Sequence, residues 1–252
     1  MLVFIVPLQS PRASSNWLLV SALCERTLRS ICAQTNDDFR VYLVCNEAPE
    51  IRFAHPALTV VEHDFPIPAR TTAARMYDKH EKLKRGLIAA RGHAPCHVMF
   101  VDADDCVHRG LAQWCAGHPA HPGWYVATGY IHTAGSRWLY LRREFDNICG
   151  TAAIVRCGEA DFPRAMTDAK ADYFMIDCGH FEFRDPERTR GRKLEALPFP
   201  GAVYMTATGE NDSGISLREW RGGKMLVKKL LNSRPLTPRL RRDFGIYEVS
   251  AG

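Results

Sequence analysis

The chain has 252 residues, enough for one large domain whose core needs no disulfide or structural metal. A hydrophobic content of 46% and a charged content of 24% exclude wholesale disorder. The mean hydropathy of -0.22 and the lack of a long apolar stretch speak against an integral membrane protein. The formal charge of +5 is compatible with an anionic ligand, a membrane surface or nucleic acid, and it is specific for none of them.

The predicted elements of the first hundred residues alternate between strands and helices. A continuous apolar run at 2–8 indicates a strand buried on both faces, and it lacks the basic start of a signal peptide. Strands are predicted at 2–8, 39–45, 58–61 and 98–101, and helices at 16–33 and 72–90. This order predicts an α/β fold with a mostly parallel sheet covered by helices, which binds ligands beyond the carboxyl ends of its strands.

The second half of the chain is less regular. Strands are predicted at 124–131, 152–156 and 202–206, and a short helix at 172–183. Nine Lys and Arg residues lie within 217–242, interleaved with apolar residues. This pattern predicts a basic helical tail over 217–252, docked on its own domain or lying on an anionic membrane. The remaining 1–216 would form one domain, with a regular half at 1–107 and a less regular half at 108–216.

The nine cysteines are an odd number, and no two of them have metal-knuckle or redox spacing. Several lie in apolar runs, where a reduced thiol behaves as a small hydrophobic group. We therefore expect buried thiols and a cytoplasmic protein.

The most informative segment is Phe100-Val101-Asp102-Ala103-Asp104-Asp105, at the end of the fourth predicted strand. Three carboxylates this close raise one another's pKa unless a cation or hydrogen-bond donors offset them. Mg²⁺ or Mn²⁺ would do so, since hard cations prefer carboxylate oxygen. The alternative is an Asp-rich turn that caps a helix beginning near His108.

Four segments occur in an order that resembles the family 2 glycosyltransferases of the GT-A fold. They are the strand at 4–8, the helix at 26–35 ending on Gln34-Thr35, the strand at 38–44, and the DxD motif Asp102-Ala103-Asp104. The resemblance is specific over 1–110 and looser to about 216. It implies a Rossmann-like GT-A fold, with a mixed, mostly parallel sheet flanked by helices.

The resemblance also implies an activity: metal-dependent transfer of a sugar from a nucleotide-diphosphate sugar to an acceptor hydroxyl, with inversion. The enzyme would be a hexosyltransferase acting on a saccharide or glycolipid acceptor in surface polysaccharide or lipopolysaccharide synthesis. It would lie in the cytoplasm or peripherally at the inner face of the membrane. No nucleic acid partner is expected.

The site residues follow from the same resemblance. Asp102 would face the ribose and diphosphate, and with Asp104 it would hold Mn²⁺ or Mg²⁺. Lys79, seven residues before Gly86, would contact the nucleotide or phosphate. The implied nucleotide-binding residues are Pro7, Leu8, Asn46, Glu47, Lys79, Asp102, Ala103 and Asp104.

Two departures from the family pattern leave the identity of the base open. The second strand ends Cys45-Asn46-Glu47 instead of in an Asp pair, and Lys84 stands where an Asn is common. The loop at 209–213 lacks the His that related enzymes bring to the metal, so Glu210, Asn211, Asp212 or water would replace it.

The general base that deprotonates the acceptor is expected to be acidic and to lie in the second half. Asp177 is the first choice, and Asp172 and Asp168 are its competitors.

Two other functions stay open at this point. A nucleotidyltransferase also uses paired Asp residues and a metal, but the loop at 8–12 has no glycine. A non-enzymatic module could use the basic tail to bind nucleic acid or an anionic membrane, although no recognised nucleic-acid motif occurs.

Overall fold

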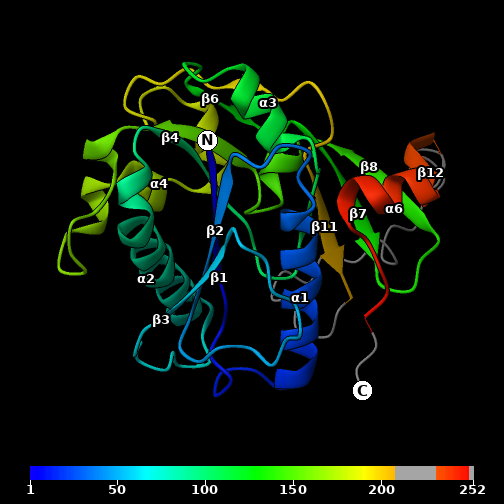
Figure 1. The fold of residues 1–252 in the computed structure, drawn as a ribbon, viewed down its shortest axis with the longest axis horizontal. Helices are drawn as coiled ribbons and strands as arrows, with labels where there is room; N and C mark the ends of the chain where they lie inside the picture. The colour runs from blue at the N-terminus through cyan, green and yellow to red at the C-terminus, as the bar shows by residue number, and fades with distance from the viewer. Residues whose placement is uncertain (208–230, 250–252) are drawn as a thin grey trace.

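In the computed structural model, which describes residues 1–207 and 231–249, the chain forms two β-sheets flanked by helices (Figure 1). One sheet has the order β10 (Glu195–Ala196), β6 (Gly123–Tyr125), β9 (Ala153–Cys157), β4 (Cys96–Phe100), β1 (Leu2–Pro7), β2 (Phe39–Cys45), β3 (Leu58–Glu62). The other has the order β12 (Ser233–Pro235), β8 (Trp138–Arg143), β7 (Thr128–Thr133), β11 (Ala202–Thr206), β5 (Cys106–Val107). Strands β1 to β4 are mutually parallel, and β9 runs antiparallel to β4. The expected fold class, a mixed α/β fold with a mostly parallel half, is confirmed.

Helices α1 (Trp17–Cys32) and α2 (Thr72–Ala90) cover opposite faces of the larger sheet. Successive residues of a strand point to opposite faces. Phe4 accordingly packs into the core cluster that contains α1, whereas Ile5 packs into the cluster that contains α2. Helix α2 lies close to β1 at Gly86, where a Cβ would come within 2.4 Å of Ile5 Cγ2. A glycine is therefore required for this helix to approach the strand.

The strands and helices predicted in the first half are all present within about two residues of their expected bounds. The second half differs in two places. The strand expected at 124–131 is divided between β6 and β7, which belong to different sheets. The helix expected at 172–183 is the single turn α4 (Phe174–Asp177), because Gly179 has extended backbone.

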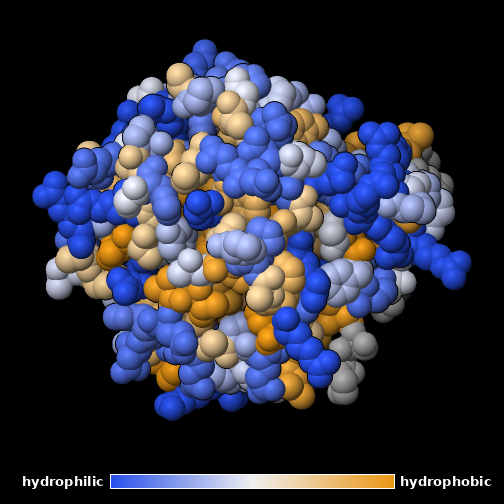
Figure 2. Space-filling view, viewed as in Figure 1, coloured by the Kyte–Doolittle hydropathy of each residue, from blue (hydrophilic) through white to orange (hydrophobic). Residues whose placement is uncertain are grey.

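The C-terminal residues that the structure describes pack on the smaller sheet. Strand β12 pairs with β8, and α6 (Pro238–Phe244) buries Phe244 against the core cluster of that sheet. Ser30 on α1 donates a hydrogen bond to the Phe244 carbonyl (2.8 Å). The surface over α6 is largely hydrophilic (Figure 2). Residues 217–230 of the predicted tail lie outside the described residues, and the domain boundary at 216 stays a prediction.

All nine cysteines are free thiols, and all but Cys32 are buried. None of the helices within 1–207 and 231–249 is long and apolar enough to cross a membrane.

Candidate active site

The Asp cluster forms the turn that leads from β4 in the larger sheet to β5 in the smaller one. The Asp105 N–H donates to the Asp102 carbonyl (3.0 Å) and closes the turn. Helix α1 holds it from one side, since Arg26 donates to the Asp104 carbonyl (2.9 Å) and the Thr27 hydroxyl donates to the Ala103 carbonyl (3.0 Å). Part of the helix motif at 26–35 thus has a physical role in fixing the backbone of the Asp turn.

The third carboxylate, Asp105, points into the core and is fully buried. It accepts hydrogen bonds from the Thr151 hydroxyl (2.6 Å), the Cys149 thiol (3.1 Å) and the Met205 N–H (3.3 Å). The Thr151 oxygen also accepts from the Asp102 N–H (3.0 Å). Asp105 therefore fastens the turn to both sheets and is a structural residue. The predicted helix-capping role is wrong, because α3 (Leu111–Gly117) has Gly110 at its N-cap and no side-chain cap.

The other two carboxylates, Asp102 and Asp104, line a cavity of about 460 Å³ beyond the carboxyl ends of β1 and β4. Predicted residues Pro7, Leu8, Lys79 and Ala103 line the same cavity. The structure therefore brings together six of the eight residues expected to bind the nucleotide.

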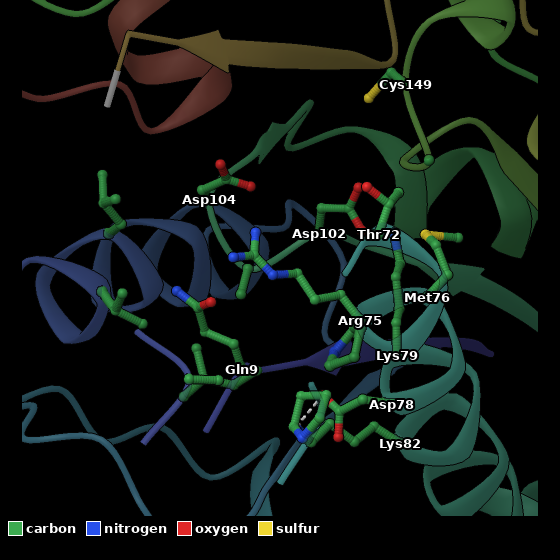
Figure 3. A pocket seen from close by; sticks show the side chains of 18 of the residues that line it. Gln9, Thr72, Arg75, Met76, Asp78, Lys79, Lys82, Asp102, Asp104 and Cys149 are labelled. Carbon is green, nitrogen blue, oxygen red and sulfur yellow. Dashed lines mark hydrogen bonds and ion pairs between the residues drawn. The ribbon is translucent and has the colours of Figure 1, made fainter. Parts of the chain in front are cut away.

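Helix α2 supplies the cationic wall of this cavity. Lys79 forms an ion pair with Asp102, and Arg75 projects into the cavity one turn earlier (Figure 3). Burial alone would lower the pKa of Lys79, but the charge and hydrogen bond of Asp102 outweigh it and raise that pKa. Gly150 lies against the pair, where a Cβ would come within 2.8 Å of Asp102 Oδ2. Lys79 is thus held as a cation between the turn and Gly150.

A second pair on α2, Asp78 and Lys82, lies deeper in the same wall (2.6 Å). Lys82 is almost fully buried, and burial lowers its pKa despite the bond to Asp78. Charged residues of a helix usually lie at the surface, but Lys82 and Lys84 do not. Lys84 is also buried, and it donates to the carbonyls of Met166 and Asp168 (both 3.0 Å).

The side chains of Asp102 and Asp104 are carboxylates, which are the ligands expected for a divalent cation. Burial, together with the charge of Asp102, raises the pKa of Asp104 to about 6. A cation bound by both carboxylates would relieve this repulsion. Within the described ranges, no group of three or more His, Cys, Asp or Glu side chains is arranged to hold a metal. The candidate third ligands Glu210, Asn211 and Asp212 lie outside those ranges.

Asn46 and Glu47 do not line this cavity. They lie in a neighbouring cavity of about 470 Å³, with Asp64 and Phe65 among its other lining residues. Asn46 donates to the Phe65 carbonyl (2.8 Å), while its Oδ1 is buried without a hydrogen-bond partner. A ligand with an N–H or O–H donor would satisfy that oxygen.

Asp177 lines neither of these two cavities. It lies at the end of α4 and forms an ion pair with Arg188 (3.3 Å). It is also near His80, whose pKa is lowered to about 4 by burial and the charges of Lys170 and Lys79, while the charge of Asp177 opposes this shift. Its role as general base stays a prediction.

The sequence did not single out several residues that line the main cavity. Arg75 could have been found from helical spacing, since it lies four residues before Lys79. Asp78 is the residue next to Lys79, which helical spacing does not place on the same face. Gln9 and Tyr204 come from a loop and from a strand of the second sheet. No pattern in the sequence places these two together.

Comparisons with known proteins give similarity at the level of structure only. No family model matches the chain. No curated protein matches it either. It is similar to S. aureus TarS 1–349, solved alone (14% identity, TM-score 0.41) and in complex with UDP (13% identity, TM-score 0.43), over 81% of this chain. The chain spans 60% of that TarS structure.

A second similar structure is the galactosyltransferase LgtC in complex with donor and acceptor sugar analogues. The match has 12% identity and a TM-score of 0.41, and it covers 96% of this chain and 99% of LgtC. TM-scores this low do not identify a function.

Proposed function

We propose that the protein is a GT-A-type glycosyltransferase that moves a sugar from a nucleotide-diphosphate sugar to an acceptor hydroxyl. One observation carries the proposal. Two carboxylates, Asp102 and Asp104, and two cations, Arg75 and Lys79, line a single cavity at the carboxyl ends of parallel strands. Cations on one wall suit a diphosphate, and paired carboxylates suit a divalent cation that also binds phosphate oxygen.

Each of these residues has a distinct part in the proposed reaction. Asp102 and Asp104 would hold Mn²⁺ or Mg²⁺, which when bound neutralises charge on the departing diphosphate. Lys79 and Arg75, both on α2, would stabilise the same charge. Pro7, Leu8 and Ala103 shape the nucleotide side of the cavity. Asn46 and Glu47, in the neighbouring cavity, would contact the base or ribose.

The second part of the proposal concerns the acceptor and the general base. Asp177 is the proposed base that takes the proton of the acceptor hydroxyl. The acceptor oxygen then bonds to the anomeric carbon as the bond to the diphosphate breaks, and this single displacement inverts that carbon. We propose a hexosyl donor and a saccharide or glycolipid acceptor of the cell surface, and a cytoplasmic protein with peripheral access to the membrane.

A thermal-stability screen tests the donor site. The midpoint of unfolding is measured with UDP, GDP, CDP and ADP, each with and without Mn²⁺. A ligand that binds only the native protein raises the midpoint by mass action. We expect one nucleotide to give a metal-dependent rise that Asp104→Ala abolishes, and hydrolysis of the matching sugar nucleotides then identifies the donor. A folded protein that responds to no nucleotide would overturn the proposal.

A further inference from the structure

Lys79 occupies a place that a divalent cation and a diphosphate would both affect. Its ammonium is paired with Asp102, and the side chains of both residues are less than one third exposed. Asp104, the second carboxylate of the proposed metal site, lines the same cavity. A dication cannot approach the Asp102 carboxylate without repelling the ammonium that is already bound there.

The surroundings limit where the ammonium can go. On one side lies Gly150, where even a Cβ would come within 3.1 Å of Lys79 Nζ. On the helix side, Asp78 is already paired with Lys82, and both side chains are buried. The remaining direction is the cavity itself, into which Arg75 also projects (Figure 3).

From this arrangement we infer that Lys79 is an exchangeable cation. Without a metal it neutralises Asp102; when Asp102 takes part in metal binding, the Lys79 ammonium is transferred to the diphosphate of the donor. The inference rests on the proposed function, and it adds a physical reason for metal and diphosphate to bind cooperatively. Each ligand favours the same position of Lys79, so each must raise the affinity of the other.

Removal of Lys79 should change the affinity for Mn²⁺ alone. A lysine too distant from Asp102 to repel a dication would leave that affinity unchanged when it is removed. An exchangeable cation competes with the metal, and it also couples metal binding to diphosphate binding. We expect Lys79→Gln to bind Mn²⁺ alone at least about fivefold more tightly than the wild type. In the variant the metal no longer has to break the Lys79–Asp102 ion pair, and a partly exposed ion pair changes a binding constant by about this factor.

The experiment is a titration with Mn²⁺ alone, followed by electron paramagnetic resonance, on the full chain. It is repeated with the nucleoside diphosphate selected by the thermal screen. Lys79→Gln should bind Mn²⁺ more tightly and the nucleotide more weakly, and the enhancement of each by the other should fall. Lys79→Arg keeps the charge and should retain the coupling. Arg70→Gln removes one exposed charge just before α2, outside both cavities, and should change neither affinity.

The possible results distinguish a failure of the Lys79 exchange from a failure of the proposed function. If Lys79→Gln leaves Mn²⁺ affinity unchanged or weakens it, the exchange is wrong, while nucleotide binding by the wild type keeps the proposed function. If the wild type binds no Mn²⁺, the exchange is also wrong. If Lys79→Gln does not fold, nuclear magnetic resonance of lysine-labelled wild type decides: Mg²⁺ alone must shift the Lys79 signal, and no shift overturns the inference.

Discussion

The two cavities at the carboxyl ends of the strands differ in how their polar groups are held. In the first, the charged groups are partly or fully buried, and the Asp turn is fixed from α1 and from Thr151. In the second, Glu47, Glu62 and Asp64 are exposed, and Asn46 is the group with a buried, unpartnered atom. A run of charged residues is therefore a candidate functional site where the fold removes it from water and fixes its backbone.

The largest expected effect concerns the support of the turn. Asp105→Ala removes a fully buried acceptor that the Thr151 hydroxyl and the Met205 N–H both use. We expect unfolding by urea to show a loss of about 3 kcal/mol. Asp64→Ala, in the second cavity, should stay within about 0.5 kcal/mol. Equal losses in the two variants would remove the distinction between the cavities.

The next effect concerns ligand binding. Asp104→Asn keeps the shape of the side chain and removes its charge, so the affinity for the nucleoside diphosphate in the presence of Mn²⁺ should fall about 100-fold. Asp64→Asn should change it by less than about threefold, because Asp64 is solvated. Isothermal titration calorimetry measures both. A larger loss in Asp64→Asn would place the ligand in the second cavity.

A smaller effect is expected at Gly150. The added methyl group of Gly150→Ala would press on Asp102 Oδ2 and Lys79 Nζ. We expect about tenfold weaker nucleotide binding, because overpacking displaces the ion pair. Gly92→Ala is the matched control, since its Cβ would meet no atom within 4 Å. If both variants bind nucleotide like the wild type, the contact at Gly150 has no role in the site.

The last expected effect is a pH dependence of stability. The pKa of Asp104 is raised from 3.8 to about 6, so the native state holds more protons than the unfolded state between these values. Stability conferred by this residue therefore falls as pH rises from about 4 to about 6, and levels off above that. The difference in unfolding free energy between wild type and Asp104→Asn, measured across this range, should follow that course. A difference that grows in favour of the wild type with rising pH would contradict it.

Much of the larger sheet could be predicted from the sequence. Runs such as 2–8 and 39–45 are apolar throughout because both faces of the strand are buried, and the spacing in α1 and α2 follows one apolar face. The position of the Asp turn at a strand end follows from the same pattern. The smaller sheet was harder, since β5, β8 and β12 are short or carry charged residues.

The order of the first elements, and the position of Asp102 and Asp104 at a strand end, follow from local periodicity and residue chemistry, which are written along the chain. Lys79 became a candidate through the family resemblance. Which charges are buried depends on the tertiary structure. In the folded chain Asp105 points into the core, Lys82 and Lys84 are buried, and Asn46 lies in a different cavity from the Asp turn. The reason is that desolvation and pairing depend on contacts between residues distant in sequence, such as Asp105 with Thr151 and Met205.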